Sequence, residues 1–188
     1  EIRLSLVGSE MCIRDREGKE ITATNQVEAN HQGVAIIVQE IGTLSGLTVA
    51  ENIFLGNEDR FTKYGVKNTA AMNRQAQEYL NSYGFSYIDA SRTIDDYNFE
   101  DRKLIEIVKS TYFNPKVLVV DETTTALGQK GREELFKVMH RMRDNGSCVI
   151  FISHDLEEVI EQSDQISVLR DGVYICLLYT SPSPETKA

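Results

Sequence analysis

Hydrophobic positions follow two periodicities along residues 17–175 of the 188-residue chain. Continuous apolar runs occupy residues 34–38 (VAIIV), 117–120 (VLVV) and 148–152 (CVIFI), and a shorter run follows at 165–169 (QISVL). Runs of this length predict strands, and the unbroken apolar character predicts burial on both faces of a sheet. Because helical patterns separate the runs, we expect parallel pairing with helices on both faces of the sheet.

Four segments carry the pattern of amphipathic helices. They are residues 70–83 ending before Gly84, residues 100–112 with Leu104, Ile105, Ile107 and Val108 on one face, residues 131–144 with Leu135, Val138, Met139 and Met142 on one face, and the acidic residues 155–161. An apolar stripe of this kind packs against a core. The span 43–112 contains no apolar run comparable to the strands, so it is predicted to be a mostly helical insertion.

The two ends of the chain differ in character from the rest. Residues 6–16 read LVGSEMCIRDR and residues 176–184 read CLLYTSPSP, and both strings resemble the conceptual translation of a transposon-type sequencing adapter. Residues 1–16 and 176–188 are therefore interpreted as adapter-like, not native, and are left out of the fold prediction. The alternative is a genuine N-terminal strand and a polar C-terminal tail.

Composition and charge indicate which kinds of molecule the chain is able to bind. The chain has 29 acidic against 20 basic side chains and a net charge of −9, which works against binding to nucleic acid or anionic lipid. No stretch of about 18 consecutive apolar residues is present, so any contact with a membrane is expected to run through a protein partner. Outside the adapter-like ends Cys148 is the one cysteine, which fits a reducing cytoplasm.

Polar residues follow three of the predicted strands. Gln39 follows the first, Asp121 and Glu122 follow the second, and His154 follows the third. Ligands of open parallel sheets bind at the carboxyl ends of the strands. Two adjacent carboxylates at the end of a buried strand are unfavourable unless a cation compensates them. Mg²⁺ suits this place, because it prefers oxygen ligands and needs only one aspartate beside substrate phosphates and water.

The same residues suggest roles in hydrolysis of a phosphate. Glu122 is placed to accept a proton from an attacking water, and His154 to contact a terminal phosphate or to position Glu122. Gln39 can bridge to the metal or to water, since its amide both donates and accepts hydrogen bonds. Taken singly, the carboxylates also fit a helix cap and His154 a structural role. Their coincidence at successive strand ends favours one joint site.

Several of these segments resemble motifs of one family. Residues 117–127 (VLVVDETTTAL) resemble the Walker B strand and D-loop of ATP-binding-cassette (ABC) ATPases. Residues 148–155 (CVIFISHD) resemble the switch-histidine segment, and residues 33–40 (GVAIIVQE) the Q-loop. Residues 47–56 (LTVAENIFLG) are typical of cassettes in bacterial monosaccharide importers of the ribose, galactose or xylose type, especially the first of two fused cassettes.

The resemblance implies an α/β fold. It is a partial P-loop NTPase (RecA-like) core with a mostly parallel sheet, plus an ABC-type helical subdomain. Residues 17–42 would form the part of the core with the Q-loop, and residues 43–112 the helical subdomain. Residues 113–175 would form the part of the core with Walker B, the D-loop and the switch histidine.

The resemblance also implies a function, namely coupling of Mg-ATP hydrolysis to sugar uptake. Asp121 and Gln39 would bind ATP and Mg²⁺. Glu122 would be the general base, and His154 would contact the γ-phosphate. The implied partners are a second cassette, membrane permeases and, indirectly, a sugar-binding protein, with no nucleic acid. The implied location is peripheral, on the cytoplasmic face of the membrane.

One family motif is missing from the sequence. No Gly-rich loop ending in Gly-Lys-Ser/Thr occurs, although this loop supplies the backbone N–H groups and the lysine that hold the β- and γ-phosphates. We expect it to precede the present sequence in the intact protein. The 188-residue chain alone is accordingly expected to bind ATP very weakly and not to hydrolyse it. Isothermal titration with Mg-ATP checks this expectation, and a micromolar dissociation constant would contradict it.

A second motif is degenerate. The family's Leu-Ser-Gly-Gly-Gln signature is replaced by Tyr97, Asn98, Phe99, Glu100 and Asp101. A carboxylate about 4 Å from a phosphate charge costs about 4 kcal/mol at an effective dielectric of about 20. The intact protein is therefore expected to pair one working ATP site with one degenerate site.

The D-loop departs from the family pattern as well. It comprises Ala126, Leu127 and Gly128, and the glycine stands where an aspartate is frequent. The loss of that polar group puts communication between the two ATP sites of a cassette pair in doubt.

Two other functions remain open. An ABC ATPase acting on nucleic acid or the ribosome is disfavoured by the negative charge and the lack of a Lys/Arg cluster. A regulatory cassette that binds nucleotide without turnover fits the degenerate signature. Retention of Glu122 and His154 argues against that second alternative.

Overall fold

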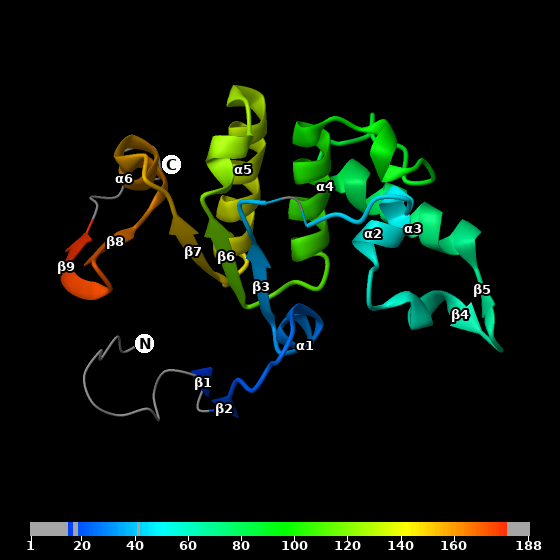
Figure 1. Cartoon of the computed structure of the whole chain (residues 1–188), viewed down its shortest axis with the longest axis horizontal. Helices are drawn as coiled ribbons and strands as arrows, with labels where there is room; N and C mark the ends of the chain where they lie inside the picture. The colour runs from blue at the N-terminus through cyan, green and yellow to red at the C-terminus, as the bar shows by residue number, and fades with distance from the viewer. Residues whose placement is uncertain (1–14, 17–18, 41, 180–188) are drawn as a thin grey trace.

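The computed structural model describes residues 15–16, 19–40 and 42–179 (Figure 1). Most of the two adapter-like strings lies outside these residues, so their interpretation stays a prediction. In chain order the helices and strands are β1 (Asp15–Arg16), β2 (Lys19–Glu20), α1 (Gln26–His31), β3 (Val34–Ile37), α2 (Val49–Ile53), η1 (Glu58–Phe61), β4 (Thr62–Lys63), β5 (Val66–Lys67), α3 (Thr69–Ser82), η2 (Ile94–Asp96), α4 (Phe99–Thr111), β6 (Val117–Asp121), η3 (Thr123–Ala126), α5 (Gln129–Asp144), β7 (Cys148–Ile152), α6 (Leu156–Gln162), β8 (Gln165–Arg170) and β9 (Val173–Tyr179).

A three-stranded sheet lies at the centre of the molecule (Figure 1). Its order is β3–β6–β7, and both pairings are parallel, as the apolar runs separated by helices predict. Ile37 pairs with Val120, and Val120 pairs with Phe151. The carboxyl ends of the three strands therefore come to the same edge of the sheet.

Burial alternates along the strands of this sheet. Ala35, Ile37, Leu118 and Val120 are buried and belong to one apolar core with residues of α4 and α5. The intervening residues are half-buried in β3 and β6, and those of β7 are exposed. The prediction that the apolar runs are buried on both faces is therefore wrong for the described residues. The physical reason is that α4 and α5 both pack on the same face.

The predicted mostly helical segment contains α2, α3 and α4, which lie beside the sheet with the short β4–β5 hairpin (Figure 1). Helix α3 coincides with the predicted helix 70–83 to within a residue, and α4 with the predicted helix 100–112. The four apolar residues predicted for the packed face of α4 are all buried. The hairpin was not predicted, because strands of two residues are too short to show an alternating pattern.

An aromatic cluster fills the space between these helices. Phe54 is fully buried, with ring centroids 4.6 Å from Phe61 and 4.8 Å from Tyr112. The ring of Tyr112 meets that of Phe54 edge-on, at 86°. Edge-to-face contacts add to the stabilisation from apolar burial, so Phe54 is the centre of this part of the core.

A capping box fixes the start of α2. The Thr48 hydroxyl accepts from the backbone N–H of Glu51, and the Glu51 carboxylate accepts from the backbone N–H of Thr48. That backbone N–H, with the nearby Lys67, lowers the pKa of Glu51. Because the folded-state pKa is lowered, the contribution of Glu51 to stability is present above the usual pKa of glutamate. It is lost as the pH falls through the folded value.

The C-terminal strands form a separate hairpin. The predicted strand 165–169 is β8, but it pairs antiparallel with β9 and not with the parallel sheet, so its predicted parallel pairing is wrong. The chain turns between the two strands at Asp171 and Gly172, which both have a positive φ. Strand β9 was not predicted, because residues 176–179 belong to the string left out as adapter-like.

Helices α5 and α6 match their predictions. The predicted apolar face of α5, Leu135, Val138, Met139 and Met142, is buried. Helix α6 begins after Asp155, whose side chain caps it by accepting from two backbone N–H groups. Among the helices of the described residues, none is both long and apolar enough to cross a bilayer.

Candidate active site

The site predicted from the strand ends lies at one edge of the parallel sheet. Asp121 is the last residue of β6 and pairs with Ile152, the last residue of β7. Gln39 lies two residues beyond Ile37, where β3 ends. The register of the sheet therefore brings the segments that carry the predicted site residues to a common edge.

Glu122 has an unusual backbone conformation at this edge. Its φ of 43° and ψ of 26° lie in the left-handed region, which is unfavourable for a residue other than glycine. Its backbone N–H donates to the carbonyl of Ile152 at 2.9 Å, and its own carbonyl accepts from the hydroxyl of Thr125 at 2.8 Å. Bonds on both sides of the residue thus hold the strained conformation.

The structure brings Glu122 and His154 together. Glu122 Oε1 lies 3.8 Å from His154 Nδ1. The separation is longer than a hydrogen bond, and both side chains face solvent, with exposed fractions of 39% for Glu122 and 69% for His154. A water molecule or a phosphate oxygen between them can contact both side chains.

Asp121 and Gln39 offer free oxygens near the same edge. Asp121 is half-buried and Gln39 is exposed, and within the described residues neither side chain has a hydrogen-bond partner. Such carboxylate and amide oxygens suit Mg²⁺. No group of three His, Cys, Asp or Glu side chains in the described part of the chain could hold a metal. Water and phosphate would have to complete the shell.

A small polar hollow of about 170 Å³ lies beside His154. It is lined by Thr124, Thr125, Arg132, Ser153, His154, Asp155 and Glu158. Arg132 Nη1 donates to Glu158 Oε1 at 3.0 Å, which ties α5 to α6 next to the histidine. Sequence reasoning missed this ion pair, because a single sequence carries no signal that joins charges 26 residues apart.

The predicted D-loop connects η3 to helix α5. Ala126 ends η3, Leu127 is buried, and Gly128 precedes the first residue of α5 without a side-chain cap. A Cβ on Gly128 would lie 3.4 Å from Glu100 Oε1, and a Cβ on Gly131 only 2.6 Å from the same atom. The carboxylate of Glu100 therefore occupies space that glycine leaves free at the start of α5.

The segment predicted to replace the family signature, residues 97–101, makes hydrogen bonds within the chain. Tyr97 accepts from the backbone N–H of Asp89 at 2.7 Å, and Asn98 caps α4 by accepting from the N–H of Asp101. Asp101 accepts from the hydroxyl of Tyr87 at 2.9 Å. Burial, reinforced by Asp101, raises the pKa of Tyr87, so that hydroxyl stays protonated and keeps donating.

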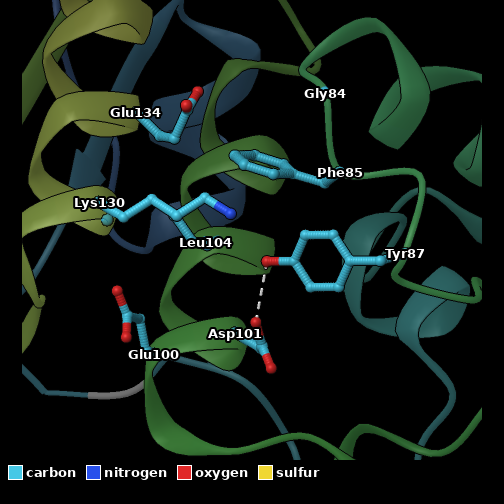
Figure 2. A pocket seen from close by; sticks show the side chains of 9 residues that line it. Gly84, Phe85, Tyr87, Glu100, Asp101, Leu104, Lys130 and Glu134 are labelled. Atoms are coloured by element: carbon cyan, nitrogen blue, oxygen red, sulfur yellow. Dashed lines mark hydrogen bonds between the residues drawn. The ribbon is translucent and has the colours of Figure 1, made fainter.

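A cavity of about 370 Å³ adjoins this segment, between the first turns of α4 and α5 (Figure 2). Glu100, Asp101 and Glu134 give its wall three carboxylates, against the single ammonium of Lys130. Phe99, the remaining residue of the segment, is half exposed. An acidic wall of this kind repels a triphosphate, and the degenerate signature stays a prediction.

No family model matches the chain. The sequence is nevertheless similar to curated proteins of one kind. It is 36% identical over 161 residues to the ribose import ATP-binding protein RbsA of Chromobacterium violaceum, covering 86% of this chain and 31% of that protein. It is 38% identical over 159 residues to the protein of the same name from Bacillus cereus, covering 85% of this chain and 32% of the relative. The chain thus spans about a third of the length of the curated relatives it matches.

Solved structures with the same fold are ATP-binding cassettes. A nucleotide-free cassette from an ABC transporter has a TM-score of 0.69 and 22% identity, over 88% of this chain and 68% of that structure. A cassette in its ADP conformation has a TM-score of 0.67 and 24% identity, over 87% of this chain and 67% of that structure. The predicted α/β fold of an ATP-binding cassette is confirmed. So is the resemblance to sugar-import ATP-binding proteins.

Proposed function

We propose that this chain is part of the ATP-binding subunit of a bacterial monosaccharide importer, in which hydrolysis of Mg-ATP drives uptake through a membrane permease. The cassette fold and the relation to ribose-import proteins support the proposal. The observation that carries it is the approach of Glu122 to His154 at the carboxyl edge of the parallel sheet. A regulatory cassette without turnover would not need a carboxylate and an imidazole at this place.

In this proposal each residue of the edge has one role. Glu122 takes a proton from the water whose oxygen attacks the γ-phosphorus, while the bond from that phosphorus to the bridging oxygen breaks and ADP leaves. His154 donates a hydrogen bond to a γ-phosphate oxygen. Asp121 and Gln39 would hold Mg²⁺ through water or directly, and that ion, when bound, would neutralise phosphate charge. The D-loop, Ala126 to Gly128, would face the second cassette.

The proposed partners follow from the similarity to ribose-import ATP-binding proteins. A second cassette, fused or dimeric, would complete the working site, and permease subunits would anchor the protein at the cytoplasmic face of the membrane. A sugar-binding protein would act indirectly, through the permease. The net charge of −9 and the absence of a basic cluster in the sequence disfavour nucleic acid as a partner.

The test uses the intact subunit together with its permease in sealed vesicles. We expect ATP-dependent uptake of labelled ribose, galactose or xylose, and faster ATP hydrolysis when the permease is present. Hydrolysis that ignores the permease but rises on addition of ribosomes or RNA would instead establish the nucleic-acid alternative. Nucleotide binding without turnover would establish the regulatory one.

A further inference from the structure

Helix α4 carries a buried ion pair that the proposed mechanism does not use. Lys103 is fully buried and Glu106 nearly so, and Lys103 Nζ lies 3.0 Å from Glu106 Oε2. Lysine is rarely buried completely, because its ammonium must then be paired and hydrogen-bonded. A sequence signal was present, since both charges fall within the apolar stretch of α4.

Both members of this pair bind the segment that follows β3. Lys103 Nζ donates to the backbone carbonyl of Val38 and, at 2.7 Å, to that of Glu40. Glu106 Oε2 also accepts from the backbone N–H of Gly42, at 3.1 Å. The two carbonyls belong to the residues on either side of Gln39. The ion pair therefore holds the backbone on both sides of Gln39, the residue whose side chain is proposed to contact the nucleotide.

The fit between helix and loop is close. A Cβ on Gly42 would lie 2.9 Å from Glu106 Oε1, so a larger residue there would displace the carboxylate. Two carbonyls and Glu106 use all three donors of the Lys103 ammonium. If the loop moved away from α4, a buried charge would lose its partners, which is strongly unfavourable.

We propose that Lys103 is a positioning residue for Gln39, and that residues 38–40 and 42 move together with helix α4 as one unit. The role of Gln39 at the nucleotide rests on the proposed function, whereas the link between loop and helix does not. Helix α4 begins at Phe99, so Glu100 and Asp101 lie in its first turn. A shift of Gln39 would then be passed directly to the segment that replaces the family signature.

The first test measures amide hydrogen exchange of the 188-residue chain. In Lys103→Met, exchange at Gly42 is expected to rise about tenfold or more, because its N–H donates to Glu106, whose carboxylate loses the ammonium that holds it in place. Amides of strand β6 should keep their rates, which separates local release from global unfolding. If Lys103→Met unfolds, Lys103→Gln, which keeps a donor without the charge, serves in its place.

The matched control is Lys137→Met. Lys137 also pairs with a glutamate three residues away on its helix, at 2.9 Å, but on the surface of α5. Its removal is expected to leave the exchange of the loop unchanged. Unchanged exchange in both Lys103 variants, or an equal rise in the control, would overturn the link between α4 and the loop.

The second test asks whether Lys103 acts through Gln39. In the intact subunit with its permease, Lys103→Gln is expected to lower kcat for ATP hydrolysis several-fold with little change in KM. In a Gln39→Ala background the same substitution should have no further effect. Additive losses would overturn the positioning role. A wild-type subunit without ATPase activity would refute the proposed function while leaving the exchange result to decide the link.

Discussion

Replacing Glu122 with glutamine in the intact subunit is expected to lower the rate of ATP hydrolysis by about 10²–10⁴-fold, the usual contribution of a general base. The amide of glutamine keeps the size of the side chain but takes no proton from water. The 3.8 Å approach of Glu122 to His154 places the lost carboxylate beside the proposed phosphate contact. Steady-state hydrolysis measures the loss, and nucleotide binding should persist.

Glu100→Gln provides the control for this prediction. Glu100 belongs to the degenerate segment, and its carboxylate lies against the start of α5. We expect the activity of Glu100→Gln to stay within about twofold of the wild type, as for a substitution away from the reacting groups. Equal losses from Glu122→Gln and Glu100→Gln would contradict the asymmetry between one working and one degenerate site.

Phe54→Ala is expected to lower the free energy of unfolding of the chain by about 3–5 kcal/mol. The ring is fully buried and meets two other aromatic rings, so its removal leaves a cavity that rigid neighbours cannot fill. Urea unfolding of the 188-residue chain, followed by circular dichroism, gives the difference in free energy.

Phe99→Ala is the matched control, because it removes the same ring from a site that is 50% exposed. Its effect on the free energy of unfolding should stay below about 1 kcal/mol, since a half-exposed ring contributes less transfer free energy and leaves no closed cavity. Similar losses for the two variants would show that Phe54 is not the centre of the helical core.

The sequence was sufficient to predict the elements that depend on local pattern. The apolar runs correspond to β3, β6 and β7, and the apolar stripes to α3, α4 and α5, because the spacing of apolar residues distinguishes strands from helices. The approach of Glu122 to His154 followed from the same reasoning, since parallel strands end at one edge. Motif resemblance added the order of the elements and the nature of the fold.

The features that sequence reasoning missed depend on contacts between distant segments. A run such as 34–38 is equally apolar whether one or both faces of its strand are covered, so the half-buried face could not be predicted. The pairing of β8 with β9 depended on residues left out as adapter-like. The contacts of Lys103 with residues about 63–65 positions earlier have no local signal beyond a charge in an apolar stripe.

The left-handed backbone at Glu122 lowers the stability of the fold, whereas the proposed catalytic role requires the carboxylate at this position. Glycine would adopt this conformation without the penalty of about 1–2 kcal/mol that a side chain brings. The greater flexibility of glycine in the unfolded chain offsets part of this gain, so Glu122→Gly is expected to raise the free energy of unfolding only slightly. Under the proposed function the same variant loses turnover, so the side chain that the chemistry needs is not the one that the backbone conformation favours.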